Sequence, residues 1–118
     1  MKENQLVELS MNFAVQILEL VKFLKQKKES IVSNQIGRSE TSIGANISEA
    51  QYAHSKPDFI SKMEIALKEA NETNYWLKLL IKSGYIDNSY YKILDASCLK
   101  IKVLLISSCK TAKQNINL

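Results

Sequence analysis

Two neighbouring stretches decide the fold: RSETSIGANISEA at residues 38–50 and FISKMEIALKEANETNYWLKLL at residues 59–80. In both, apolar residues recur at intervals of three and four, the spacing of one face of an α-helix. The second stretch carries two such faces, so its helix is expected to pack on two sides. One face is mainly apolar and comprises Phe59, Met63, Ala66, Ala70, Thr73, Leu77 and Leu80, and the mixed face comprises Ile65, Glu69, Glu72, Trp76 and Leu79.

The same spacing recurs on both sides of these stretches and predicts four helices in a single domain. Ser55 and Asp58 flank Pro57 in a capping box that begins the third helix, and Gly84 is typical of a helix C-terminus. Because the connections are only a few residues long, neighbouring helices must run antiparallel. The predicted fold class is therefore all-α, an antiparallel up-down-up-down four-helix bundle. The domain is expected to cover residues 1–118, with helices at about 5–28, 30–53, 56–83 and 88–114.

The second predicted helix carries a polar residue on its core face. We expect that face to comprise Val32, Ile36, Ser39, Ile43, Asn46, Ala50 and Ala53. Asn46 is therefore interpreted as a specificity device that selects one helix register or assembly. Gly37 and Gly44 each cost a helix up to about 1 kcal/mol relative to alanine. We expect a neighbouring backbone to approach closely at both glycines and to compensate for this cost.

Antiparallel pairing predicts a partner for the single arginine of the chain. If the turn between the second and third helices centres near Ser55, Arg38 lies opposite Glu72, with Glu69 one turn away. Glu49 is about 16 Å from Arg38 along the helix axis and is a poor partner for it. We predict that Arg38 pairs with Glu72 or Glu69, and we interpret the pair as fixing helix register or a subunit contact.

Composition limits the classes of function. The chain has 16 basic and 12 acidic residues, a formal net charge of +4, and Arg38 is its single arginine. Sequence-specific readers of nucleic acid rely on arginine. A surface in which nearly all cations are lysine instead suits solubility or non-specific attraction to phosphate.

The start of the chain and its cysteines predict a cytoplasmic protein. The start, MKENQLVELSMNF, resembles neither a signal peptide nor a membrane-spanning helix. Cys98 and Cys109 fall on one predicted helix about 16 Å apart, too far for a disulfide within it. We expect both thiols to be reduced and buried, and no membrane partner.

The residue types present argue against an enzyme. A di-iron bundle needs Glu-x-x-His motifs, whereas His54 is the single histidine and lies near a helix end. Glu69 and Glu72 could serve as an acid and base pair, but no nucleophile or oxyanion donor accompanies them. The sequence therefore predicts no catalytic residues, no metal, no cofactor and no small-molecule substrate.

Three motifs carry a resemblance to a known family: RSETSIGANISEA at 38–50, DFISKMEIALKEANETNYWLKLL from 58, and GYID at 84–87. They resemble the bacterial four-helix-bundle proteins found in intervening sequences of 23S ribosomal RNA genes, which are similar to the accessory variability protein of diversity-generating retroelements. The resemblance implies a ring-like homopentamer and, in the retroelement branch, binding to RNA and a reverse transcriptase. It also implies structural or interfacial roles for Arg38, Asn46, Glu49, Glu69 and Glu72.

Two classes of non-enzymatic function stay open. The first is an RNA-associated or reverse-transcriptase-associated adaptor, in which lysines attract phosphate and the largest local excess of lysine lies in the fourth helix. The second is a protein-interaction module with no nucleic-acid role, in which Tyr75 or Trp76 contacts another chain. The candidate phosphate-binding residues are Lys25, Lys28, Lys100, Lys102 and Lys110.

Overall fold

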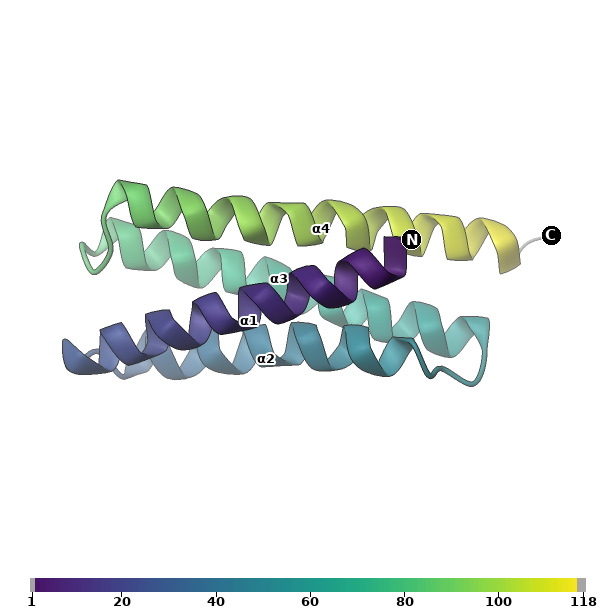
Figure 1. Ribbon diagram of the computed structural model, residues 1–118, viewed down its shortest axis with the longest axis horizontal. Helices are drawn as coiled ribbons and strands as arrows, with labels where there is room; N and C mark the ends of the chain where they lie inside the picture. Colours follow the sequence, from purple (N-terminus) through teal and green to yellow (C-terminus); the bar gives the residue numbers. More distant parts are fainter. Residues whose placement is uncertain (1, 117–118) are drawn as a thin grey trace.

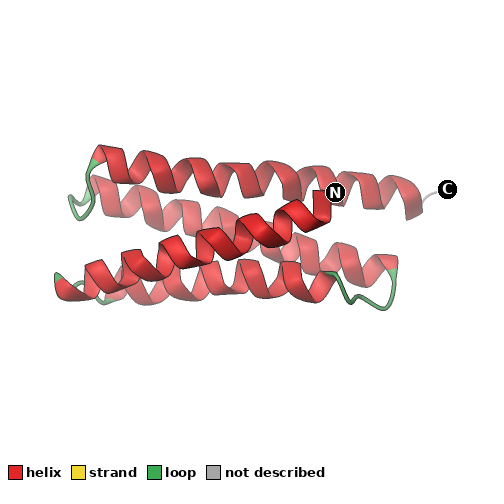
Figure 2. Ribbon diagram, in the orientation of Figure 1, coloured by secondary structure: helices red, strands yellow, loops and turns green. Residues whose placement is uncertain are grey.

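The computed structural model describes residues 2–116 and contains four helices in an up-down-up-down arrangement (Figure 1). All regular structure in this range is helical (Figure 2). Each helix packs against the two beside it, and α1 closes the bundle against α4. The predicted fold class is confirmed. The helices are α1 (Lys2–Gln26), α2 (Ile31–Ala50), α3 (Lys56–Lys82) and α4 (Asn88–Ile116).

The helix ends differ from the prediction by up to three residues. The first helix ends at Gln26 instead of residue 28, because Lys28 adopts a left-handed φ of 63° and ends the helix. The second helix is shorter at its end, since residues 51–53 form turn hydrogen bonds instead of helical ones. The ends of α3 follow the prediction closely: Ser55 accepts from the Asp58 backbone N–H at 3.2 Å, and Gly84 has a φ of 81°.

The start of α2 is capped by Glu29, which was not among the predicted capping residues. The Glu29 carboxylate is buried and accepts hydrogen bonds from the backbone N–H groups of Ile31, Val32 and Ser33 at 2.8–3.0 Å. The Ser33 hydroxyl donates back to the Glu29 carbonyl at 2.9 Å. Ser30 occupies the usual cap position but makes no side-chain cap bond. Glu29 therefore satisfies the N–H groups that a helix start leaves without partners.

The core face of α2 differs from the predicted one near residues 46 and 47. Ile47 is fully buried, whereas Asn46 is half-buried and donates to the Ser42 carbonyl of its own helix at 2.8 Å. Ala53 lies beyond the end of the helix. Asn46 therefore lies beside the core and not in it, and the prediction that it occupies a core position is wrong. The buried residues of α2 are Val32, Ser33, Ile36, Ser39, Glu40, Ile43, Ile47 and Ala50.

The predicted close approach at the two glycines is also wrong. A Cβ added at Gly37 would meet only the Val21 side chain, at an ordinary 3.5 Å. A Cβ added at Gly44 would meet nothing within 4 Å. Neither glycine is therefore required by backbone packing, and Gly44 borders open space.

The apolar face of α3 is as predicted from Met63 to Leu80. Met63, Ala66, Ala70, Leu77 and Leu80 are fully buried. Thr73 is buried with them because its hydroxyl pairs with the Ser39 hydroxyl of α2 at 2.7 Å and donates to the Glu69 carbonyl at 2.9 Å. This pair satisfies both buried hydroxyl groups across the α2–α3 interface.

Both cysteines are free and buried, as predicted. Cys98 Sγ donates to the Ala70 carbonyl at 3.5 Å, which joins α4 to α3, and burial raises the pKa of the Cys98 thiol to about 12. No helix within residues 2–116 combines the length and the apolar character needed to cross a bilayer.

Candidate functional site

The polar cluster on the α2–α3 face is built around Arg38. Its Nη1 lies 3.3 Å from Glu69 Oε2, and its Nη2 donates to Glu72 Oε2. The predicted pairing across the hairpin is therefore confirmed, and Arg38 contacts both carboxylates. Arg38 Nε also donates to Gln35 Oε1 at 3.4 Å. Because the Arg38 side chain is 50% exposed, this cluster lies at the surface, where ion pairs contribute little free energy.

Two aromatic side chains extend this cluster along α3. The Trp76 indole N–H donates to Glu72 Oε2 at 3.1 Å. Glu72 Oε2 therefore accepts hydrogen bonds from both Arg38 and Trp76. Tyr75 packs edge-on against Trp76 with ring centroids 5.0 Å apart. Tyr75 is 58% exposed, whereas Trp76 is half-buried. The two residues predicted as partner contacts thus adjoin the Arg38 cluster and form one surface with it.

Replacing Arg38 with alanine is expected to lower the free energy of unfolding by only about 0.5–1 kcal/mol, because the ion pairs are exposed to solvent. It should also change the fluorescence of Trp76, the single tryptophan, because Glu72 loses one of its two partners. Urea unfolding followed by that fluorescence measures both effects. Lys62→Ala, which removes the 3.6 Å pair with Glu49, is the matched control and should leave the folded-state spectrum unchanged. A loss above about 2 kcal/mol would contradict a surface role.

Glu49 and Asn46, the other predicted polar residues, lie outside this cluster. Glu49 Oε1 lies 3.6 Å from Lys62 Nζ, which makes a second ion pair between α2 and α3. Asn46 Nδ2 bonds the carbonyl and, at 3.2 Å, the hydroxyl of Ser42. The structure brings together Arg38, Glu69 and Glu72 but not all five residues. Their roles in register or assembly stay a prediction.

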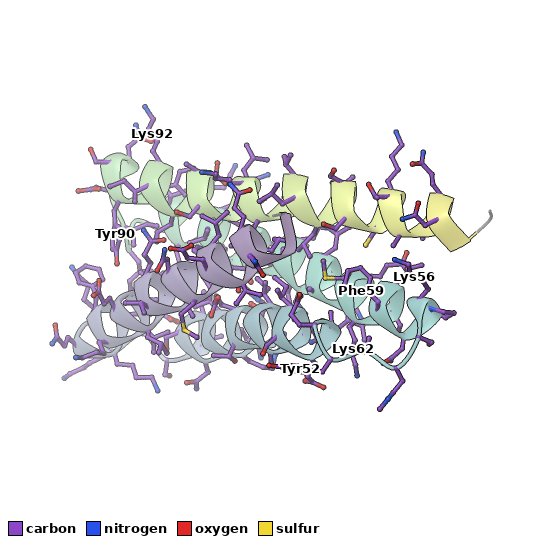
Figure 3. The ribbon with its side chains drawn as sticks, turned by 45° about the vertical axis from the view of Figure 1, so that its right-hand side comes forward. Tyr52, Lys56, Phe59, Lys62, Tyr90 and Lys92 are labelled. Atoms are coloured by element: carbon purple, nitrogen blue, oxygen red, sulfur yellow. The ribbon has the colours of Figure 1, made fainter. Side chains whose placement is uncertain are left out.

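The predicted lysines do not form one patch on a single bundle. The Phe23 and Tyr90 rings, 6.2 Å apart, align the end of α1 with the start of α4. Lys110 is twenty residues beyond Tyr90, so it lies about 30 Å from Lys25 and Lys28. Figure 3 shows the same dispersion for other lysines, with Lys92 and Lys56 at opposite ends of the molecule.

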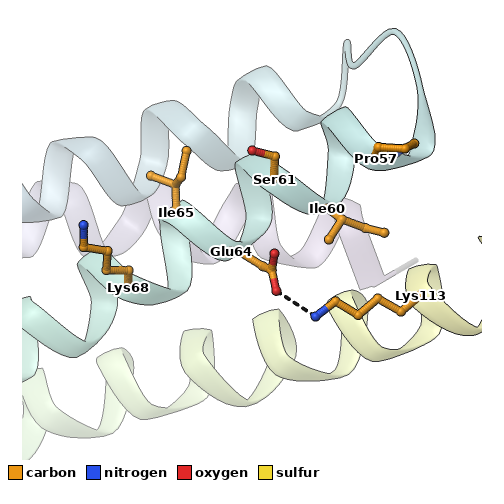
Figure 4. A pocket seen from close by; sticks show the side chains of 7 residues that line it. All are labelled: Pro57, Ile60, Ser61, Glu64, Ile65, Lys68 and Lys113. Atoms are coloured by element: carbon orange, nitrogen blue, oxygen red, sulfur yellow. Dashed lines mark hydrogen bonds and ion pairs between the residues drawn. The ribbon is translucent and has the colours of Figure 1, made fainter.

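Within α4 the lysines also diverge around the helix. Lys100 and Lys102 are about 160° apart by helical geometry. Lys100 lies beside Asn12 and Gln16 of α1. Lys113 instead turns to α3, where its Nζ lies 2.7 Å from Glu64 Oε2 beside an open groove lined by Pro57, Ile60 and Ile65 (Figure 4). The expected concentration of positive charge on α4 is therefore spread over several faces.

Glu40, the most unusual ionisable residue in the described part of the bundle, was not among the predicted site residues. Its side chain is fully buried, and no group in the described part of the chain hydrogen-bonds either carboxylate oxygen. Burial raises the pKa of Glu40 from 4.5 to about 7. The sequence does carry a pattern that indicates burial of Glu40. Residues 36, 40, 43, 47 and 50 are spaced alternately by four and three, as are the residues of the predicted core face through Asn46.

Glu40 lines a pocket of about 220 Å³ between α1 and α2. The other lining residues are Val7, Ser10, Met11, Ala14, Thr41, Gly44, Ala45 and Ser48. Across residues 2–116, no three His, Cys, Asp or Glu side chains are grouped so that they could hold a metal ion. The pocket therefore combines one carboxylate with hydroxyl and apolar groups, without a nucleophile paired to a base.

Comparisons with known proteins agree with this architecture. The family model described as 23S rRNA-intervening sequence protein matches residues 2–107. A crystal structure of a protein with unknown function from the S23 ribosomal protein family, from Bacteroides thetaiotaomicron VPI-5482, is 52% identical in sequence and superposes with a TM-score of 0.91. That match covers 93% of this chain and 99% of the other. No curated protein matches the sequence.

Proposed function

The chain belongs to the 23S rRNA-intervening sequence protein family, and from this premise we propose that it is a homo-oligomeric scaffold that acts by binding, without a chemical step. The observation that carries the proposal is a pair of apolar stripes on the outer faces of the bundle. The α1 stripe comprises Met11, Val15 and Leu18, and the α4 stripe comprises Leu99, Val103 and Ile106.

The two stripes have the pattern of helix-packing surfaces. In both, the residues are spaced by four and then three, which is the repeat of a helix–helix seam. All six side chains are 51–65% exposed, although such residues are usually buried. A contiguous exposed apolar row on a small monomer marks an interaction site. The half-exposed Ile65 and Leu79 of α3 add further apolar surface of the kind predicted from the sequence.

The position of the stripes favours a ring. They lie on different helices and point away from the core on different sides, so packing one stripe of a copy on the other stripe of the next gives a head-to-tail contact. Head-to-tail contacts close into a ring when the rotation permits. The family resemblance supports five copies in that ring.

Light scattering with two single variants tests this assembly. Val15→Glu and Val103→Glu each place a charge in one stripe, and each variant alone should have the 13.4 kDa mass of one chain. Their equimolar mixture should form dimers, because each supplies the stripe that the other lacks. Ile31→Glu, at an exposed residue outside both stripes, is the matched control and should retain the wild-type mass.

Other outcomes of that experiment contradict the proposal. A wild-type mass of one chain at micromolar concentration would remove the oligomer. Persistent self-association of either stripe variant would show that a stripe packs on its own copy, and a ring of the proposed kind would then be wrong.

RNA is the second element of the proposal, as the partner of the assembled ring. The support is a net charge of +4 and sixteen basic side chains. Because the lysines of one bundle are dispersed, a continuous phosphate-binding surface would need lysines from neighbouring copies. Retention of RNA on a filter should fall steeply with salt for the wild-type protein and be lost in the monomeric stripe variants. Retention without salt dependence, or none at low salt, would favour the alternative.

The alternative partner is another protein, of which a reverse transcriptase is one example suggested by the resemblance. The exposed Tyr75 and its neighbour Trp76 support this alternative, because aromatic residues are enriched in binding hot spots. Tyr75→Ala should then abolish capture of a partner while leaving the oligomer mass unchanged. If the protein recovers only itself, the alternative fails.

A further inference from the structure

The pocket between α1 and α2 has a buried polar floor and an exposed rim. Ser10 is 3% exposed and Glu40 is fully buried, whereas Met11, Thr41, Ala45 and Ser48 are exposed. A group that enters from solvent therefore passes mainly apolar and small side chains before it reaches the carboxylate. This arrangement is typical of ligand sites, in which a few polar groups fix the orientation of a ligand in an apolar cleft.

Ser10 on the pocket floor and Thr41 on its rim can accept hydrogen bonds, because each hydroxyl already donates its proton within α1 or α2. The Ser10 hydroxyl donates its proton to the Val7 carbonyl at 3.0 Å, and the Thr41 hydroxyl donates to the Gly37 carbonyl at 2.8 Å. Their oxygens keep lone pairs that can accept. When the carboxyl is ionised, both Glu40 oxygens are acceptors to which no group in the described part of the chain donates. The group that complements these atoms must bring several donors and a positive charge.

The pocket also remains open at a cost to the helix. Gly44 lines it, and a Cβ at this position would meet nothing within 4 Å. An alanine would fit and would stabilise the helix by up to about 1 kcal/mol relative to glycine. The glycine is therefore not explained by packing within the bundle, and its absent side chain enlarges the space beside Glu40.

We propose that this pocket binds a primary ammonium group, with the Glu40 carboxylate as its counter-ion and the Ser10 and Thr41 hydroxyl oxygens as further acceptors. An ammonium group has three N–H donors on a slender alkyl stem, which suits a narrow cleft lined by small residues. None of the nine lining residues is a cation, so no described residue of the pocket lining supplies such a group.

The ammonium group could come from a free alkylamine or from a lysine of a neighbouring copy. Met11 belongs to both the pocket rim and the α1 stripe, so a copy packed on that stripe would lie beside the pocket. The lysine source rests on the proposed oligomer, whereas the free amine does not. Light scattering on the same sample separates failure of the oligomer from failure of the pocket.

The first arm of the test measures binding of n-butylammonium by calorimetry at about pH 8. The wild-type protein should bind it saturably, and the uncharged analogue n-butanol should not replace it. Glu40→Gln should weaken binding roughly ten-fold or more, since a hydrogen bond to a charged group is lost. Gly44→Leu, which keeps Glu40 but fills the pocket, should abolish binding.

Binding of the amine should also weaken as the pH falls through about 7, because Glu40 then becomes protonated. The Cys98 thiol of α4, whose pKa is raised to about 12 mainly by burial and in smaller part by the charge of Glu40, stays neutral over this range. The Glu40→Gln variant should therefore show no such pH dependence.

The second arm identifies a lysine source. Copies with and without ¹⁵N are mixed, treated with a carbodiimide that joins adjacent carboxyl and amine groups, and analysed by mass spectrometry. A peptide linking Glu40 to a lysine of the other isotopic form assigns the ammonium group to a neighbouring copy. Butylammonium binding that depends on Glu40, without such a peptide, assigns it to a free amine. The proposal would be overturned if there were neither a cross-linked peptide nor butylammonium binding that depends on Glu40. It would also be overturned if the Glu40→Gln variant bound butylammonium as tightly as the wild type.

Discussion

Between about pH 4 and about pH 8, the wild-type protein is expected to lose about 3 kcal/mol of unfolding free energy that the Glu40→Gln variant retains. Burial raises the pKa of Glu40 from 4.5 to about 7, and each pKa unit corresponds to about 1.4 kcal/mol. Within this window the folded chain binds more protons than the unfolded chain, so stability falls as the pH rises. Above about pH 7 the folded protein carries a buried carboxylate with no hydrogen-bond partner among the described residues, and the loss is complete.

The comparison of the two proteins isolates this effect from other titrations. Urea unfolding followed by Trp76 fluorescence, at fixed protein concentration, gives the free energy at each pH. The relevant quantity is the difference between wild type and variant, because the amide that Glu40→Gln introduces has its own constant cost of burial. Glu49→Gln, at an exposed carboxylate, is the matched control and should follow the wild-type pH profile. A Glu40→Gln profile parallel to that of the wild type would show that Glu40 has an ordinary pKa.

Replacing Glu29 with alanine is expected to lower the free energy of unfolding by about 3 kcal/mol. The Glu29 carboxylate accepts three backbone N–H bonds at the start of α2, and two of the donors belong to the buried residues Val32 and Ser33. Loss of a cap costs about 1 kcal/mol, and each buried donor left without a partner adds about 1–3 kcal/mol before relaxation. The negative charge also lies at the positive end of the helix dipole.

Two matched variants make this prediction specific. Ser30→Ala removes the side chain at the usual cap position, which makes no cap bond, and should leave stability almost unchanged. Glu29→Gln keeps an acceptor oxygen and should recover part of the loss. Thermal or urea unfolding of the three variants measures these differences. If Ser30→Ala were as destabilising as Glu29→Ala, the assignment of the cap to Glu29 would be wrong.

The fold could be predicted because one of the two faces of α3 is almost entirely apolar and therefore identifies the core side of the helix. Its alanines and leucines define a single core face from Met63 to Leu80, and the short connections leave only antiparallel neighbours. In α2 the same spacing admits two seams, one through Asn46 and one through Glu40 and Ile47. The residue types did not show which of the two seams faces the core, since each seam contains a polar residue. The packing of α1 against α2 decided between them by burying Glu40.

The polar sites differ in how far they could be predicted. The pairing of Arg38 with Glu69 and Glu72 follows from the helix rise and the position of one hairpin turn, so the antiparallel register predicted it from the sequence. The Glu29 cap depends on the left-handed φ of Lys28, a conformation that a lysine rarely adopts and that composition does not indicate. The dispersion of the lysines also follows from helix geometry, because Lys100 and Lys102 are about 160° apart on any α-helix and Lys110 lies about 30 Å along the bundle from Lys25.

The buried thiol of Cys98 makes local opening of the bundle measurable without an introduced probe. Its sulfur is closed off between α3 and α4 by the contact with the Ala70 carbonyl, and a neutral thiol does not react with disulfide reagents. Reaction must therefore wait until these helices separate, and its rate reports how often they do so. The rate of Cys98 modification therefore measures how often α3 and α4 separate, and it can be measured with and without RNA or a protein partner.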